Sequence, residues 1–328
     1  MKLIPRLAQH FKTSEYFVAD ILRRKVKSDH SEASDLRALR DALSPREYKA
    51  VHFALNSNLR AEKVVAKARQ RGLIPNGARR AMDIGAGYGG LTAAMADAGM
   101  EAVGIELEPA YVRLAGLNLA GRNGDVRSGD ILELSPDDIG TFDFITCTNV
   151  IEHVADVELL LAKIASFLNP GGAALFEAPN YRSIKNVIGD VHHRVFGIQL
   201  LHYSAAERSH GFDFNESQPS TIGEMFSLGR YLTMIKRAGL CAEKLPYDGR
   251  LPSDGELFAH LAELSTKAAE LSASDRYDWF LRTEITQKCA AYSASYSCGL
   301  ERFILDGDAM FVEMFIEPVW SFVARKAD

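Results

Sequence analysis

The sequence predicts an α/β protein organised around a mostly parallel β-sheet. From residue 79 onward, short apolar runs that suit buried strands alternate with segments that carry apolar residues at helical spacing. Parallel strands need a crossover connection, usually a helix, so this alternation indicates a sheet with helices on its faces. A second observation agrees with the first. The apolar run 81–84 leads directly into the closely spaced glycines of 85–90, as in a tight strand-to-helix turn.

The individual elements are predicted from apolar runs and from helix start and stop signals. We expect strands at 81–84, 102–105, around 126, 142–147, 173–178, 240–245 and 319–324. We expect helices at 89–98, 109–121, 157–168 and 221–239. Thr221 and Glu224 would open the last of these as a capping box, and residues 169–172 would stop the third.

Residues 1–77 are predicted to form a helical extension in front of this fold. Apolar positions recur at helical spacing over 6–27, and residues 44–47 have the composition of a strong helix start. The helix that they open is expected to run to about Arg71, before Gly72. Such an extension could cap the active site, mediate dimerisation or cover an edge of the sheet.

The composition is that of an ordinary globular protein, with 47% hydrophobic and 25% charged residues. The four cysteines form no C-x-x-C pair, which favours neither a zinc site nor a disulfide framework. The sequence begins without the apolar segment of a signal peptide and holds no uninterrupted apolar run of transmembrane length. We therefore expect a cytoplasmic protein without a membrane segment.

The net charge of −5 is unevenly distributed along the chain. Residues 1–80 carry 18 Lys and Arg against 8 Asp and Glu, whereas the remainder is acidic. A basic segment can bind anionic partners. However, no compact run of Lys and Arg with interleaved aromatic residues occurs. We interpret the charge as a solvated helical face and do not expect nucleic acid as a partner.

The stretch around the first turn suits a nucleotide-like ligand. The first N–H groups of a helix lack partners within the helix and attract anions, and glycines let the backbone approach a ligand closely. Glu106, about twenty residues on, suits the two hydroxyl groups of a ribose. Read as Gly85-x-Gly87-x-x-Gly90, the stretch also satisfies the fingerprint of a dinucleotide cofactor. Asp83 favours S-adenosylmethionine (SAM) instead, because a carboxylate there suits an ammonium group and would repel a pyrophosphate.

Six motifs in order resemble those of the class I SAM-dependent methyltransferases. They are Asp83-Ile84-Gly85-Ala86-Gly87-Tyr88-Gly89, Gly104-Ile105-Glu106, Gly129-Asp130-Ile131, Phe142-Asp143, Asn149-Val150-Ile151-Glu152-His153-Val154 and Leu168-Asn169-Pro170-Gly171-Gly172. The chain most resembles the branch that contains quinone-biosynthesis and other small-molecule O-methyltransferases, over residues 79–180 and more weakly over 226–239 and 321–326. The resemblance implies a Rossmann-like, seven-stranded methyltransferase sheet with an antiparallel last strand, and SAM as the cofactor.

With this resemblance, residues 78–328 are expected to form the SAM-binding domain. In the family the region after the fifth strand lies over the substrate pocket, so we expect a substrate lid at about 179–222. Helical spacing over about 254–300 predicts a second, helical insertion. Its aromatic residues are expected in the core or at the interface of a homodimer; they are Tyr277, Trp279, Phe280, Tyr292 and Tyr296.

The resemblance also implies a set of cofactor-binding residues: Asp83, Gly85, Gly87, Glu106, Asp130, Ile131 and Asn149. The first three would hold the methionine end of SAM, and Glu106 would bind the ribose. Asp130 would accept a hydrogen bond from the amino group of adenine, with Ile131 beside the ring. Asn149, at the end of the fourth strand, would approach the methionine moiety. The alternative for Asp130 is an ordinary turn residue.

Methyl transfer from a sulfonium is an in-line displacement that needs a positioned nucleophile and, for a hydroxyl acceptor, removal of a proton. His153 is a candidate base because imidazole titrates near neutral pH, and Glu152 could orient it. In the quinone branch an acidic residue commonly stands at the position of Asn149 and forms a metal site with residues matching Glu152 and His153. Asparagine is a weaker ligand, so we expect no metal. The alternative for His153 is a helix cap without chemistry.

Histidines are concentrated between residues 179 and 222, where His192, His193, His202 and His210 lie. His192 and His193 are further candidates for the base. These histidines could instead contact an anionic substrate or lie on the surface. Their spacings match no standard metal site.

We therefore expect an enzyme that moves a methyl group from SAM to a small molecule, with a hydroxyl oxygen as the favoured acceptor. Three alternatives stay open. They are an N-methylating or RNA-directed enzyme that uses the basic N-terminal helices, an NAD-binding oxidoreductase, and a SAM-binding partner subunit without turnover. Residues 149–152 do not form the N-P-P-[YF] sequence, which disfavours methylation of a nucleic-acid base.

Overall fold

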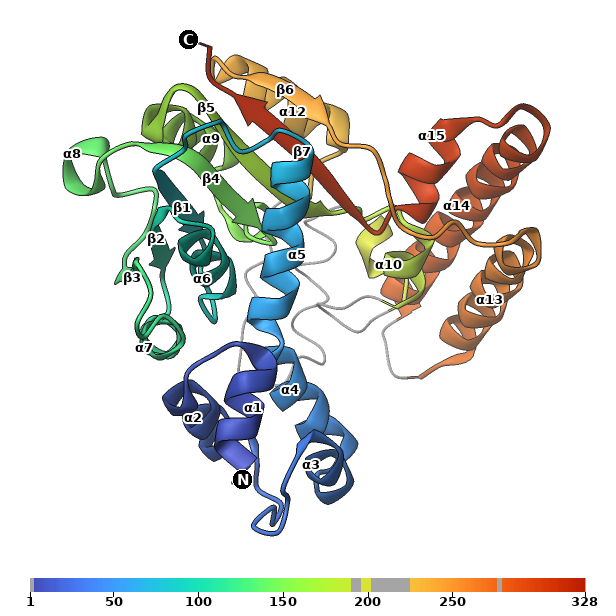
Figure 1. Cartoon of the computed structure of the whole chain (residues 1–328). Helices are drawn as coiled ribbons and strands as arrows, with labels where there is room; N and C mark the ends of the chain where they lie inside the picture. Colours follow the sequence, from blue (N-terminus) through green and yellow to red (C-terminus); the bar gives the residue numbers. More distant parts are fainter. Residues whose placement is uncertain (1–2, 190–195, 202–224, 276–278, 328) are drawn as a thin grey trace.

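Seven strands form one sheet in the computed structural model, which describes residues 3–189, 196–201, 225–275 and 279–327. The strands are β1 (Arg80–Ile84), β2 (Glu101–Glu106), β3 (Gly124–Ser128), β4 (Phe142–Thr148), β5 (Leu168–Pro179), β6 (Cys241–Lys244) and β7 (Val319–Arg325). Their order is β3-β2-β1-β4-β5-β7-β6. β7 runs antiparallel to β5 and β6, whereas the other neighbours are parallel (Figure 1). The predicted seven-stranded sheet with an antiparallel last strand is confirmed.

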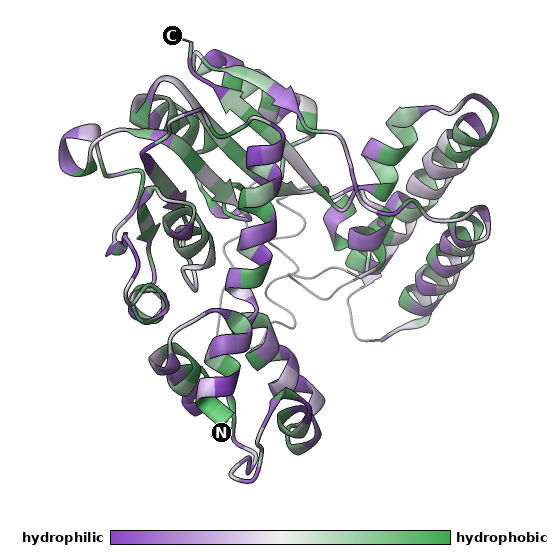
Figure 2. Cartoon of the chain, viewed as in Figure 1, coloured by the Kyte–Doolittle hydropathy of each residue, from purple (hydrophilic) through white to green (hydrophobic). Residues whose placement is uncertain are grey.

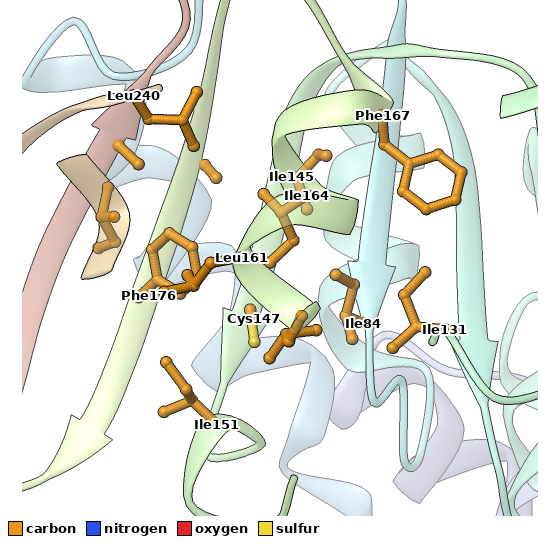
Figure 3. Packing of buried hydrophobic residues seen from close by; sticks show 14 of the residues in the cluster. Ile84, Ile131, Ile145, Cys147, Ile151, Leu161, Ile164, Phe167, Phe176 and Leu240 are labelled. Carbon is orange, nitrogen blue, oxygen red and sulfur yellow. The ribbon is translucent and has the colours of Figure 1, made fainter. Parts of the chain in front are cut away.

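Helices cover both faces of this sheet. On one face, α9 (Val157–Phe167) and α12 (Leu228–Arg237) share a buried apolar cluster with the strands. Figure 3 shows side chains of α9 packed against those of the central strands. On the opposite face, α5 (Ser57–Gln70) and α6 (Gly90–Asp97) share a second cluster with the strands. The sheet is therefore the middle layer of three.

The alternation of side chains along β1 decides which residues meet which helices. Met82 and Ile84 belong to the cluster under α9 and α12, and Ala81 belongs to the cluster under α5 and α6. Asp83 lies on the same face as Ala81, because successive side chains of a strand point to opposite faces. Burial of both faces explains the nearly continuous apolar sequence of the central strands, which are largely hydrophobic in Figure 2.

The first helices form a cluster with its own apolar core. They are α1 (Leu3–Phe11), α2 (Glu15–Lys25), α3 (Leu36–Ala42) and α4 (Pro45–Leu55). Buried side chains from all four build the core, among them Leu7, Phe11, Phe17, Ile21, Leu39 and Val51. Leu114 of α7 (Pro109–Asn118) joins the same core, so the cluster packs directly against the sheet domain. From this cluster α5 leads across the sheet (Figure 1).

One continuous helix was predicted where the structure has two. The start is as expected: Ser44 and Glu47 form a capping box at the beginning of α4. The prediction that this helix continues to Arg71 is wrong, because Asn56 ends α4 and begins α5 with φ −78° and ψ 7°. The short side chain of asparagine competes with helical backbone bonds, so Asn is a weak residue inside helices. The interruption lets the chain change direction between the cluster and the sheet.

A second helical group lies on the other side of the molecule. α13 (Asp254–Ala273) and α14 (Trp279–Asp306) lie side by side (Figure 1). Three short segments complete their apolar core: α10 (Ile184–Ile188), α15 (Ala309–Phe311) and η3 (Val312–Ile316). Tyr292 and Tyr296 are buried there, whereas Trp279 and Phe280 are 71% and 60% exposed. Tyr277 lies outside the described residues.

Two predicted boundaries near the middle of the chain need correction. Residues 225–227 are not helical, and Ser227 caps α12, so that helix begins at Leu228 and does not run continuously from residue 221. Thr221 and Glu224, the expected cap, lie outside the described residues. α9 ends at Phe167 and β5 follows at once, so residues 169–172 belong to that strand.

The remaining short helical segments are α8 (Pro136–Ile139), η1 (Ile151–His153) and η2 (Ile198–Leu200). In the part of the chain that the structure describes, no helix is both long and apolar enough to span a membrane.

Candidate functional site

The turn after β1 is held by backbone hydrogen bonds to β2. The N–H groups of Gly85 and Ala86 donate to the carbonyl of Ile105 at 2.8 and 3.1 Å. Gly85, Gly87 and Gly89 have φ values of +72°, +53° and +75°, a left-handed region that residues with a Cβ atom disfavour. The turn delivers the chain to the start of α6, where N–H groups without helical partners attract anions.

Neighbouring elements touch this turn so closely that a Cβ atom would not fit. A Cβ atom at Gly85 would lie 2.3 Å from Cγ2 of Val150, in the loop after β4. A Cβ atom at Gly90 would lie 2.8 Å from the carbonyl oxygen of Ser57, at the start of α5. Gly85 is nevertheless exposed, so its backbone is accessible to a ligand. At position 85, packing and backbone conformation therefore both require glycine.

Glu106, at the end of β2, reaches the same turn. One carboxylate oxygen accepts from the N–H of Gly87 at 2.7 Å, and the other accepts from the N–H of Glu108 at 2.9 Å. The side chain that was predicted to bind a ribose thus lies directly beside the glycines that were predicted to hold the methionine end. The ribose contact itself stays a prediction.

The two residues predicted to bind adenine follow β3, close to the end of β2. The N–H of Gly129 donates to the carbonyl of Glu106 at 3.1 Å, which brings Asp130 near that edge. One carboxylate oxygen of Asp130 accepts from the N–H of Leu132 at 2.9 Å, as in an Asx turn. Ile131 is 6% exposed and belongs to the apolar cluster under α9 (Figure 3). For both residues, contact with adenine stays a prediction.

Asp83 supports the turn from within the protein. It is 2% exposed, and its two carboxylate oxygens accept from the hydroxyls of Thr92 at 3.0 Å and Thr146 at 2.8 Å. Burial raises the pKa of Asp83 to about 6, although the two threonine hydrogen bonds act in the opposite direction. The alternation of β1 directs this side chain under α6, so its contacts here link β1, β4 and α6. Direct contact with the ammonium group of SAM stays a prediction.

The loop after β4 crosses the turn and carries two of the predicted site residues. Asn149 is exposed and has φ +54°, a conformation that asparagine tolerates better than most residues. Its N–H donates to the carbonyl of Glu177 at 3.0 Å. The N–H of His153 donates to the carbonyl of Val150 at 2.8 Å. Because Val150 also touches Gly85, the loop brings Asn149 and His153 to the edge of the sheet where the turn lies.

Glu152 and His153 form a loose pair. Nε2 of His153 lies 3.8 Å from Oε1 of Glu152, and the His153 side chain is 39% exposed while that of Glu152 is 1% exposed. The other carboxyl oxygen of Glu152 has no hydrogen-bond partner among the described residues, and burial raises the pKa of Glu152. Among the same residues, no group of three or more His, Cys, Asp or Glu side chains is arranged to hold a metal ion. His192 and His193 lie outside the described residues.

The structure adds residues that the sequence did not indicate. Thr92 and Thr146 satisfy Asp83, and Val150 is the neighbour that makes glycine necessary at Gly85. The contacts of Thr146 and Val150 depend on β1 and β4 being neighbours in the sheet, and that of Thr92 depends on how α6 packs on β1, so no local pattern marks them.

A family model described as a methyltransferase domain matches residues 29–241 of this chain. The chain belongs to the class I SAM-dependent methyltransferases. The sheet order with an antiparallel last strand agrees with this membership, which also establishes SAM as the family's cofactor. The match to a methyltransferase domain disfavours the NAD-binding alternative.

Curated relatives of this methyltransferase include two enzymes named ubiquinone biosynthesis O-methyltransferase. The one from Xanthomonas axonopodis pv. citri is 36% identical over 142 residues, which is 43% of this chain and 55% of the relative. The one from Bordetella avium is 34% identical over 104 residues, which is 31% of this chain and 43% of the relative. The chain thus spans about half the length of the curated relatives that it matches.

Solved structures with a similar fold include a SAM-dependent methyltransferase from Archaeoglobus fulgidus, at 14% identity and a TM-score of 0.45, covering 84% of this chain and 99% of that one. Another is a phosphoethanolamine N-methyltransferase 2 from Haemonchus contortus in complex with SAM, at 16% identity and a TM-score of 0.46, covering 84% of this chain and 56% of that one.

Gly85→Ala is expected to weaken SAM binding at least tenfold, because the new methyl group would collide with Val150 and shift the turn or the loop after β4. Isothermal titration of the full-length protein with SAM measures the effect. Gly99→Ala is the matched control, since Gly99 also has positive φ, +90°, but nothing lies within 4 Å of its Cβ position. Equal affinity of the two variants for SAM would contradict the assignment of the turn to the cofactor.

Asp83→Asn is expected to stabilise the ligand-free protein at pH 8 and to leave its stability unchanged at pH 4. Burial raises the pKa of Asp83 to about 6 in the folded protein from its ordinary value of 3.8, so folding favours the protonated form. The contribution of Asp83 to the free energy of unfolding therefore falls as pH rises from about 4 to 6 and stays low above it.

Asparagine does not titrate, so the variant should gain about 3 kcal/mol over the native protein at pH 8. Urea unfolding at both pH values gives the difference. Asp137→Asn, at an exposed position, is the control and should change stability by less than about 0.5 kcal/mol at both. A gain that is the same at pH 4 and pH 8 would exclude the titration of Asp83 as its cause.

Proposed function

We propose that this methyltransferase transfers the methyl group of SAM to a hydroxyl oxygen of a small molecule. The observation that carries the proposal is the glycine turn, exposed at Gly85 and bordered by the carboxylate of Glu106. The choice of oxygen is supported by the curated relatives, which are named O-methyltransferases.

The residues around the turn suit SAM in shape and in chemistry. Only glycine fits beside Val150, so the backbone of Gly85 offers the cofactor a surface without a side chain. We assign the methionine end to the Gly85 and Gly87 backbone with Asn149, supported from beneath by Asp83. We assign the ribose to Glu106. The remaining two residues of the predicted set, Asp130 and Ile131, would hold adenine.

When bound, SAM supplies an electrophilic methyl group on a sulfonium. The chain's own part is to orient the acceptor oxygen in line with that methyl group and to take its proton. We assign the proton to the imidazole of His153, which is exposed on the loop that also carries Asn149. Glu152, 3.8 Å away, would stabilise the imidazolium, because a positive charge on His153 lowers the pKa of Glu152 and favours its ionised form. His192 and His193 are the alternative bases.

The acceptor in this proposal is a small molecule that carries negative charge. Arg182 follows β5 at the same edge of the sheet as the loop after β4, and it is only partly exposed. Its Nε atom is buried and has no hydrogen-bond partner in the part of the chain that the structure describes. A carboxylate or phosphate of the acceptor would satisfy it.

The lid at 179–222 and the homodimer through the exposed aromatic residues Trp279 and Phe280 belong to the same proposal.

An RNA-directed activity is less well supported. Part of the positive charge of the N-terminal helices is already neutralised: Arg23 and Arg24 pair with the buried Asp20, and Lys12 pairs with Glu62. These pairs favour the interpretation of a solvated and packed helical surface.

Titration with SAM and, separately, with NAD tests the cofactor half of the proposal. We expect SAM to bind and NAD to show no measurable heat. A panel of phenols and catechols with and without a carboxylate group, assayed for S-adenosylhomocysteine release, tests the acceptor half. NAD binding without SAM binding would overturn the proposal, and methylation of amines with no methylation of hydroxyls would overturn the choice of oxygen.

His153→Ala is expected to lower turnover by about 10² to 10⁴, the usual contribution of general base catalysis, and to leave the affinity for SAM within twofold. Turnover is measured with an acceptor from the panel, and affinity by titration. His10→Ala, at an exposed histidine of α1, is the control and should retain full rate. Full rate in His153→Ala would remove the imidazole from the mechanism.

A further inference from the structure

Two buried asparagines join the first helices to the cofactor turn. Asn58, at the start of α5, is 2% exposed, and Asn118, at the end of α7, is 0% exposed. Their side-chain amides bond to each other in both directions. Nδ2 of Asn58 donates to Oδ1 of Asn118 at 2.9 Å, and Nδ2 of Asn118 donates to Oδ1 of Asn58 at 2.7 Å.

The second N–H of each amide reaches in a different direction. That of Asn118 donates to the carbonyl of Tyr88, between Gly87 and Gly89 of the turn, at 2.9 Å. That of Asn58 donates to the carbonyl of Lys12, at the corner between α1 and α2, at 2.7 Å. The hydroxyl of Thr13, at the same corner, donates to Oδ1 of Asn118 at 2.5 Å. The pair therefore connects that corner to the turn.

The hydrogen bonds fix the orientation of both side-chain amides. A side-chain amide has two N–H donors, and in Asn58 and Asn118 both are used. At less than 3% exposure, a broken bond would leave an unpaired polar group away from water, which is costly. The carbonyl of Tyr88 is consequently fixed by groups that the sheet itself does not supply.

The ring of Tyr88 is held by α2 and α7. It packs edge-to-face against Phe17 of α2 and Tyr111 of α7, with ring centroids 6.2 and 5.1 Å away. Nζ of Lys25, at the end of α2, lies 5.7 Å from the centre of the ring. Burial in this setting raises the pKa of the Tyr88 hydroxyl. One residue of the turn is thus anchored at its carbonyl and at its side chain.

We propose that Asn58, Asn118 and Tyr88 are positioning residues for the cofactor, through which the N-terminal helices hold the turn in its SAM-binding shape. The inference rests on the proposed placement of SAM at the Gly85–Gly89 turn. A segment with three left-handed glycines loses much conformational freedom when it becomes ordered. Ordering it before SAM arrives removes that cost from the binding step. By linkage, SAM must in return stabilise the helices that order the turn.

Asn118→Ala in the full-length protein is expected to weaken SAM binding about tenfold in isothermal titration, since it removes both amide N–H donors and one acceptor. Thr13→Val removes only the hydrogen bond from the Thr13 hydroxyl to Asn118 and should weaken SAM binding two- to fourfold. Asp35→Ala is the matched control. It removes the N-cap of α3 and so destabilises the N-terminal helices, but the cap bond of Asp35 goes to Ala38 and not to the asparagine pair.

A second readout needs no ligand. In Asn118→Ala, amide hydrogen exchange of residues 83–91 should be faster than in the native protein, and in Asp35→Ala it should be unchanged. In the native protein, SAM should slow exchange in residues 57–70. If Asn118→Ala does not fold, Thr13→Val carries the same comparison against Asp35→Ala.

The outcomes separate this inference from the proposed function. Failure of the native protein to bind SAM would overturn the function, whereas the exchange of 83–91 would still test the positioning. Native SAM affinity and native exchange in Asn118→Ala and Thr13→Val would overturn the inference alone. An equal loss of affinity in Asp35→Ala would also overturn it, since general loosening of the helices would then be enough.

Discussion

At the end of β1 the chain makes a turn whose three glycines have positive φ, with no room for a side chain at Gly85, and much of the structure is arranged around that constraint. Val150 lies so close to Gly85 that a Cβ atom there would collide with it, and Ser57 lies similarly close to Gly90. The loop after β4 and the start of α5 therefore lie against the backbone of the turn. The backbone at Gly85 nevertheless stays exposed, so a ligand can contact it directly.

Three carboxyl groups near this turn differ in their surroundings. Glu106 is half-buried and accepts two backbone N–H groups, which fixes it beside Gly87. Asp83 is buried with two threonine hydroxyls, and burial raises its pKa. Glu152 is buried with one oxygen unpaired among the described residues. The first is suited to meet a ligand, the second to support the turn, and the third to respond to a charge on His153.

The two peripheral helical groups relate to the sheet in different ways. The N-terminal helices contact the turn directly where Phe17 of α2 packs against the ring of Tyr88, and they reach it indirectly through Asn58, which bonds to Asn118 of α7. The group around α13 and α14 builds a separate apolar core together with α10, which follows β5. Its aromatic side chains divide accordingly, with Tyr292 and Tyr296 inside that core and Trp279 and Phe280 exposed. The first group therefore contacts the turn after β1, whereas the second is joined to the segment that follows β5.

Local patterns in the sequence were sufficient for the strands, for most helices, for the glycine turn and for the family. Hydrophobic periodicity, caps and glycine spacing act over a few residues, so they are readable without the fold. They did not reveal the break at Asn56, where a polar residue of weak helix propensity lies inside an otherwise helical pattern.

The tertiary structure alone decided which side chains meet. Asn58 and Asn118 are 60 residues apart in the chain, and Asp83 and Thr146 are 63 apart. Such partners are selected by strand order and helix packing, which no local pattern encodes. The sequence therefore determined the cofactor class and the glycine turn after β1. Only the folded chain determined that Asp83 lies beneath that turn and that the first helices hold it in place.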